Sequence, residues 1–142
     1  MKLIKPKLPS LQRTAAVVPL NSSGATLSGP DRGIPRPDSS APTAEERAIL
    51  ALSATELARR IAAQELSSVQ VVRAFVGQIT RHNVTYNAIV QLDLDAALER
   101  AKAADEALAR GEVWGPLHGV PVTVKDTYAT RGLRTTAGDP AL

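Results

Sequence analysis

The sequence has no cysteine, which excludes disulfide bonds and thiolate metal sites. Aromatic residues make up only 3% of the chain, too few for a nucleic-acid surface built on base stacking. With two histidines, His82 and His118, a histidine-rich metal site is equally unsupported. No stretch is apolar enough to span a membrane or to form the core of a secretory signal. We therefore expect no metal or other cofactor, and neither a nucleic-acid nor a membrane partner for the folded part.

The positive charge of the chain is unevenly distributed. The formal net charge of the 142 residues is +3, yet residues 1–44 contain six basic and only two acidic residues. Residues 45–142 contain 11 basic and 12 acidic residues and are close to neutral. The excess of basic residues therefore belongs to the leading segment, and it says little about the partners of the part that folds.

Residues 1–44 have the composition of a disordered tail. Seven of the ten prolines lie in the first 42 residues, with glycine and serine between them, and no apolar period persists. Such a segment buries too little surface to offset its ordering entropy. A targeting peptide is the alternative, because residues 1–30 are basic and contain no acidic residue. We expect a cytoplasmic protein, with targeting left open, and a folded domain over residues 45–142.

Helical patterns begin at residue 53. A capping-box pattern, Ser-x-x-Glu, stands at residues 53–56, and a second one, Ser-x-x-Gln, at residues 67–70. Apolar residues at helical spacing follow each box, and after the second box these are Val72, Phe75, Val76 and Ile79. We predict two short amphipathic helices that are joined near residues 65–67 and that turn their apolar faces to the core.

A strand, a helix and a second strand are predicted next. The runs Ala88–Leu92 and Val120–Lys125 are short, apolar and rich in β-forming residues. Between them, alanines at helical spacing predict a helix over Ala96–Arg110, with Asp95 as its cap and Gly111 as its stop. This order of elements predicts an α/β fold with a strand–helix–strand unit at its centre.

The predicted third helix has two further features. Its face of small residues would allow it to lie close to a sheet, and these residues are Ala97, Ala101, Ala104 and Leu108. Glu106 and Arg110 are spaced as an i,i+4 ion pair on its surface.

Lys125 ends the second predicted strand. In open α/β sheets, ligands bind at the carboxyl ends of the strands, so this position suits a functional amine. A solvent-exposed lysine that merely closes a strand is the alternative, and the pattern alone favours it.

The run GPLHGVPVTVKD at residues 115–126, followed by TYATRGLRTTAG at 127–138, resembles the amidase signature family of serine amide hydrolases. Three upstream stretches are similar to the opening helices and first strand of that family: SATELARRIAAQELSSVQVV, NAIV and ALERAKAADEALARGE. The resemblance covers about residues 50–142. It implies the opening part of the amidase signature fold, a mixed β-sheet covered by helices.

The same resemblance implies a Ser–Ser–Lys triad, with Lys125 at the position of the catalytic lysine. In that mechanism a neutral lysine takes a proton, through a bridging serine, from a second serine that attacks the amide carbonyl. Burial of an ammonium group favours its neutral form, which would explain a lysine at the edge of an apolar strand. The implied substrate is a small-molecule amide, and no cofactor is needed.

Other residues of the motif are interpreted as structural. We expect His118 to hold its loop, since the family does not use this histidine as the base. We interpret Asp126 as a residue that holds a loop or supports a neighbouring site residue, rather than as a catalyst. Thr135 and Thr136 match a threonine pair of the family that we consider structural. Asp139 stands where the family often has a serine, which puts any role of that serine in doubt.

Both triad serines follow the lysine in the family, but residues 126–142 contain no serine. The Ser22–Ser23 pair lies in the predicted tail, on the wrong side of Lys125. We therefore expect the N-terminal part of an amide hydrolase, truncated before its serines and inactive alone. Two alternatives remain: part of a glutamyl-tRNA(Gln) amidotransferase A-type subunit, which releases ammonia from glutamine, or a non-catalytic interaction module.

Overall fold

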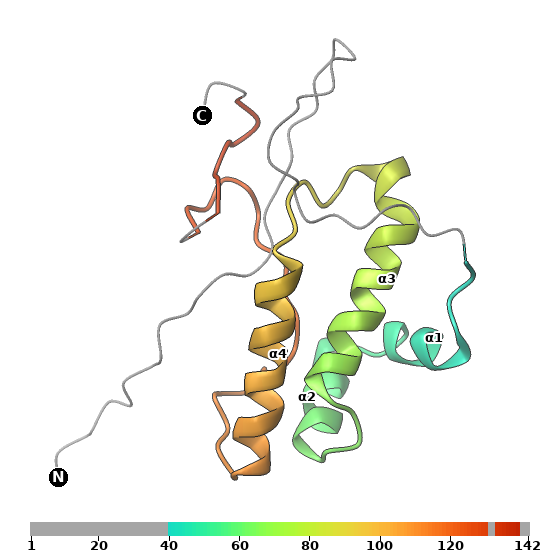
Figure 1. Ribbon diagram of the computed structural model, residues 1–142, viewed down its shortest axis with the longest axis vertical. Helices are drawn as coiled ribbons and strands as arrows, with labels where there is room; N and C mark the ends of the chain where they lie inside the picture. The colour runs from blue at the N-terminus through green and yellow to red at the C-terminus, as the bar shows by residue number, and fades with distance from the viewer. Residues whose placement is uncertain (1–39, 131–132, 140–142) are drawn as a thin grey trace, which may run out of the picture.

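The computed structural model describes residues 40–130 and 133–139 of the chain. The predicted tail lies outside the described residues as far as residue 39. Within the described part, no helix is both long and apolar enough to cross a membrane. The described elements are four helices (Figure 1): α1 (Ala44–Leu50), α2 (Ala54–Ala62), α3 (Ser68–Tyr86) and α4 (Leu94–Ala109).

The helices pack around α3. Helix α4 runs back alongside α3, and α1 contacts α3 on another side (Figure 1). One apolar cluster joins α1, α2 and α3, and its buried members are Ile49, Leu57, Ile61, Val71 and Ala74. The face that α4 buries consists of small side chains, Ala101, Ala104 and Ala107. Small residues allow the two long helices to approach closely, so the face predicted to lie on a sheet lies beside a helix instead.

The starts of the helices explain why the chain folds at these positions. At α3, Ser67 and Gln70 form the complete capping box that the sequence predicts. At α2, Ser53 accepts a hydrogen bond from the backbone N–H of Glu56 at 3.2 Å, but the reciprocal bond is absent. The Glu56 carboxylate instead accepts from Arg59 and Arg60, each at 2.9 Å. The predicted box at α2 is therefore only half formed.

Helix α1 is not among the predicted elements. It begins after Thr43, which forms a capping box with Glu46: the Thr43 N–H donates to the Glu46 carboxylate at 2.7 Å. The same carboxylate lies 3.4 Å from the guanidinium of Arg81, whose side chain is only 7% exposed. Glu46 therefore both caps α1 and ties it to the middle of α3.

Helix α3 is longer than the short helix predicted, with 19 residues from Ser68 to Tyr86. Its buried apolar residues are Val71, Val72 and Ala74, while Phe75, Val76 and Ile79 are only partly buried. The predicted stripe is thus displaced by about one residue. The reason is that α3 is covered on two sides, by α4 and by α1, rather than on one.

Helix α4 starts two residues earlier than predicted. Asp93, not Asp95, is its cap, and its side chain accepts from the backbone N–H of Ala96 at 3.3 Å. The predicted pair of Glu106 with Arg110 is also wrong, because Arg110 pairs with Glu112 at 3.2 Å. Gly111 ends the helix with φ +78°, in the left-handed region, as the sequence predicts.

The two predicted strands are wrong: the described residues contain no strand. A strand needs a neighbour for its backbone groups, and at residues 88–92 a side chain takes that part. Asn83 of α3 donates to the carbonyl of Ile89 at 2.6 Å and accepts from the N–H of Ile89 at 2.8 Å. A single isolated bridge at Gln91 is the one β-type pairing assigned in this part of the chain. Residues 120–125 have no regular secondary structure, and no described backbone hydrogen bond joins them to residues 88–92.

Candidate functional site

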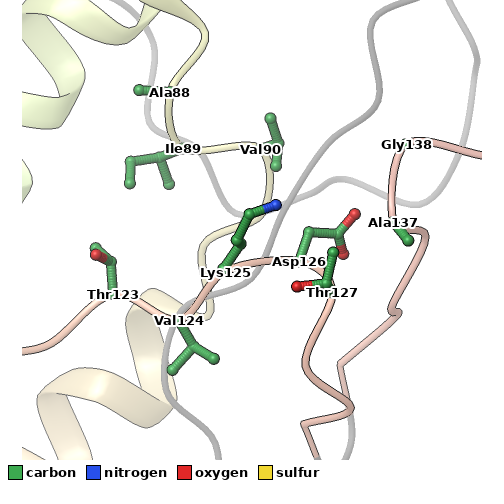
Figure 2. Close-up of a pocket in the computed structure, with 10 residues that line it drawn as sticks. All are labelled: Ala88, Ile89, Val90, Thr123, Val124, Lys125, Asp126, Thr127, Ala137 and Gly138. Atoms are coloured by element: carbon green, nitrogen blue, oxygen red, sulfur yellow. The ribbon is translucent and has the colours of Figure 1, made fainter.

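The two segments predicted as strands meet at a hollow of about 590 Å³ near the C-terminal end of the described chain (Figure 2). A third segment, which contains Ala137 and Gly138, lines another side of the hollow. The lining residues are Ala88, Ile89, Val90, Thr123, Val124, Lys125, Asp126, Thr127, Ala137 and Gly138. The structure therefore brings together the two predicted strand segments, although it does not pair them.

Lys125 lies on the wall of this hollow. Its side chain is exposed and reaches toward Val90 (Figure 2). Among the described residues, no carboxylate lies within ion-pair distance of its amine. Its carbonyl accepts a hydrogen bond from the N–H of Tyr128 at 3.0 Å, which turns the chain immediately after the lysine. Within the described residues, the Lys125 amine therefore faces the hollow at a bend of the chain, without an ion-pair partner.

Asp126 has a different environment from its neighbour Lys125. Its carboxylate accepts from the backbone N–H of Thr136 at 3.0 Å and from the hydroxyl of the same threonine. Thr136 is 1% exposed and Asp126 is half-buried, so this contact is partly shielded from solvent. Figure 2 shows the carboxylate turned toward Ala137, whereas the Lys125 amine lies on the side of Val90. These bonds agree with the separate interpretations of Asp126 as a loop partner and of Thr136 as structural, and they show a pairing that the sequence did not predict.

The turn at Thr136 is shaped to hold an anion. Ala137 and Gly138 both have left-handed backbone angles, with φ +50° and φ +85°. This conformation directs successive N–H groups to one point, and such concavities bind anions. The hydroxyl of Thr136 and the N–H groups of residues 136–138 hold the pKa of Asp126 below its usual range. Asp126 is therefore a bound carboxylate at neutral pH.

His118 holds the loop that leads to the hollow. It is 5% exposed, and its Nδ1 accepts a hydrogen bond from the backbone N–H of Trp114 at 3.0 Å. Its Nε2 lies 2.9 Å from the carbonyl of Ala104, so the neutral ring donates there. The guanidinium of Arg100 lies 3.7 Å from the centre of the Trp114 ring. The loop-holding interpretation of His118 is confirmed, since both ring nitrogens are occupied by backbone.

A family model described as Amidase matches residues 70–142, just over half of the chain. The chain belongs to the amidase family. The matched region contains every residue that lines the hollow, including Lys125. The resemblance seen in the sequence is therefore confirmed at the level of the family.

Curated relatives and a solved structure agree with this assignment. The chain is 42% identical over 94 residues to the A-type subunit of the glutamyl-tRNA(Gln) amidotransferase of Streptomyces coelicolor, a match that covers 66% of the chain and 19% of the relative. It is 46% identical over 92 residues to the same subunit from Burkholderia vietnamiensis, covering 65% of the chain and 18% of the relative. A solved fatty acid amide hydrolase superposes with a TM-score of 0.57 and 45% identity, covering 59% of this chain and 15% of that one. The chain spans about a fifth of the length of these relatives and shares the amidase fold over the matched part.

Two features of the site were missed in the sequence. The bond from Thr136 to Asp126 joins residues ten positions apart, and only the Thr-Thr-x-Gly pattern hinted at a turn there. The pairing of Asn83 with Ile89 left no periodic signal, because one polar residue in the last turns of a helix is common. An asparagine that stands five residues before a short apolar run is the signal that could have raised the question.

Proposed function

We propose that the complete protein hydrolyses carbon–nitrogen amide bonds with a serine nucleophile and with Lys125 as the base. The observation that carries this proposal is the position of Lys125, which matches the lysine of the motif that resembles the family. Its amine faces the hollow, and no described carboxylate forms an ion pair with it. The family assignment supplies the reaction class. We propose a small-molecule amide as the substrate.

In the proposed reaction, Lys125 in its neutral form accepts a proton through a bridging serine from the attacking serine. The serine oxygen bonds to the amide carbonyl carbon, the C–N bond breaks, and the amine leaves with a proton. Water then hydrolyses the acyl-enzyme and restores the serine. Residues 126–142 contain no serine, so residues 1–142 provide only the base, and we expect them to be inactive by themselves.

The mixed β-sheet of the family fold is part of this proposal. Residues 88–90 and 123–125 of the two segments already line one hollow. They would become strands when neighbouring strands supply backbone partners. Such a sheet would also cover Lys125, and desolvation of an ammonium group favours the neutral form that a base needs.

A second candidate is the reaction of a glutamyl-tRNA(Gln) amidotransferase A-type subunit. The observation that favours it is the name shared by the curated relatives, which are 40–46% identical over about two thirds of the chain. In that case the amide substrate would serve as a nitrogen donor, and the protein would act within an assembly. The residues of the hollow do not distinguish the two substrates.

The test is to join the chain in frame to the downstream part of a relative and to measure amide hydrolysis. We expect activity in the completed enzyme and its loss in Lys125→Ala, while the circular dichroism spectrum is unchanged. Lys102→Ala, on the exposed surface of α4, is the matched control and should retain activity. Turnover that survives Lys125→Ala would contradict the proposal. Adding glutamine and charged tRNA to the same enzyme separates the second candidate from the first.

A further inference from the structure

Lys125 and Asp126 are consecutive in the sequence and opposite in charge, yet they do not pair. No ion pair between them is present, and the carboxylate is bound instead by the turn at residues 136–138. A nearby carboxylate stabilises the ammonium form of a lysine, so an acidic neighbour opposes the loss of its proton. The direction of the Asp126 side chain therefore bears on what Lys125 can do.

We propose that Asp126 is a positioning residue whose carboxylate is held by Thr136 and the following turn, away from the Lys125 amine. The arrangement has two consequences. It anchors the segment of residues 133–139 as a wall of the hollow, and it leaves the Lys125 amine without an ion-pair partner among the described residues. The catalytic meaning of the second consequence rests on the proposed function, but the charge separation itself does not.

The geometry supports this arrangement in three independent ways. The carboxylate has two bonds to one buried residue, from the N–H and from the hydroxyl of Thr136. The left-handed angles at residues 137 and 138 bring further N–H groups to the same point. The Thr136 hydroxyl is itself positioned, since it accepts from the N–H of Gly138 at 3.3 Å.

The charged groups around the hollow are few. Lys125 and Asp126 are the only titratable residues among those that line it. The other described charged residues on the three segments that surround it are Asp93, Arg134 and Asp139. Among the acidic groups named here, Asp126 is therefore the one whose loss of its bonds to Thr136 would most directly favour the charged form of the Lys125 amine.

The test uses the chain itself, labelled with ¹³C at the lysine side chains, and follows the titration of each amine by NMR. Lys125→Arg assigns the signal of Lys125, and Lys102 is the internal reference. Thr136→Val removes the hydroxyl but keeps the side-chain shape and the backbone N–H, and it should weaken the hold of the turn so that the carboxylate spends more time near the amine. We expect the titration midpoint of Lys125 to rise by about 0.5 pH unit, the size of an exposed ion pair. Thr136→Ser keeps the hydroxyl and should leave the midpoint unchanged.

Two further variants separate charge from shape. The double variant Asp126→Asn with Thr136→Val should return the midpoint to that of the wild type, because no carboxylate remains to be released. Asp126→Asn alone should leave the midpoint within about 0.2 pH unit of the wild type. A fall of about 0.5 pH unit in Asp126→Asn would show that the pair exists in the native chain and would overturn the proposal. An unchanged midpoint in Thr136→Val would also overturn it.

The amide spectrum of each variant verifies that the fold is retained. The readout does not depend on turnover, so it separates the two proposals. If the completed enzyme kept its activity after Lys125→Ala, the proposed function would fail while the titration result stood. If the midpoints moved as expected and Lys125→Ala abolished turnover, the activity of Thr136→Val should require a higher pH than that of Thr136→Ser.

Discussion

Asp105 of α4 caps the start of α3. Its two carboxylate oxygens accept from the backbone N–H of Ser68 at 2.6 Å and of Val69 at 3.2 Å. These are among the N–H groups that a helix start leaves without an internal partner. The bond joins residues 37 positions apart, so one carboxylate both completes the start of α3 and holds α4 beside it.

Replacing Asp105 with alanine should therefore destabilise the fold. Two backbone donors would lose their partner, and the loss of a helix cap costs about 1–2 kcal/mol. Urea denaturation followed by circular dichroism measures the change. Glu106→Ala, the next residue and exposed on the same helix, is the control and should change stability by less than about 0.5 kcal/mol. Equal effects of the two variants would contradict the capping role.

Gly119 is required by space as well as by backbone angle. Its φ is +73°, and a Cβ built there would lie 2.0 Å from the Oγ of Ser68. We expect Gly119→Ala to cost about 2 kcal/mol or more, combining backbone strain with overpacking. Gly111→Ala is the matched control, because Gly111 has φ +78° but nothing within 4 Å. It should cost only about 1 kcal/mol of backbone strain.

The cause can be isolated with a second change at the contact. Ser68→Ala removes the oxygen that a Cβ at Gly119 would meet and leaves the Ser68 Cβ at 3.0 Å. Gly119→Ala should therefore cost less in the Ser68→Ala background than in the wild type. The same cost in both backgrounds would assign the whole effect to backbone strain.

Only part of the fold and of the candidate site can be predicted from the sequence. Local signals were sufficient for the cap at Ser67 and for the stop at Gly111, because capping and left-handed turns depend on a few adjacent residues. The prediction of strands at residues 88–92 and 120–125 was wrong because strands do not depend on adjacent residues alone. A strand depends on partners distant in sequence, and at Ile89 those positions are taken by Asn83. The lysine of the site was found from its motif, whereas the turn that binds Asp126 required the structure.

His118 should be essential to the stability of the loop before the hollow. His118→Ala leaves the N–H of Trp114 and the carbonyl of Ala104 without their partner and leaves a void in a buried position. We expect a loss of about 2–4 kcal/mol and faster hydrogen exchange at the Trp114 amide. His82→Ala, at an exposed position on α3, should have little effect. A stable His118→Ala variant with a protected Trp114 amide would refute the loop-holding role.

Glu56 makes a predictable contribution to acid sensitivity. Hydrogen bonds from Arg59, and then from Arg60, lower its pKa from 4.5 to about 2. A depressed pKa in the folded state stabilises the protein above the unfolded value and loses that effect as pH falls. The contribution of Glu56 is therefore complete above pH 4.5 and disappears between pH 4.5 and about 2.

Thermal unfolding of Glu56→Gln across that pH range checks this expectation. The variant should be less stable than the wild type above pH 4.5, and the difference should shrink toward pH 2. Replacing Arg59 and Arg60 together with glutamine should produce the same convergence, since it removes the groups that lower the pKa. A difference between Glu56→Gln and the wild type that is constant with pH would contradict the ion-pair origin.

The contact between Arg100 and Trp114 gives the chain a natural spectroscopic reporter. Trp114 is the single tryptophan in 142 residues, so emission excited selectively at tryptophan comes from one indole. That indole lies under the Arg100 guanidinium at 3.7 Å and beside the His118 ring at 5.1 Å. Arg100 belongs to α4 and leaves the indole when the loop of Trp114 and His118 separates from that helix. Emission wavelength and lifetime should therefore register the opening of this corner before global unfolding, with no dye attached and no residue replaced.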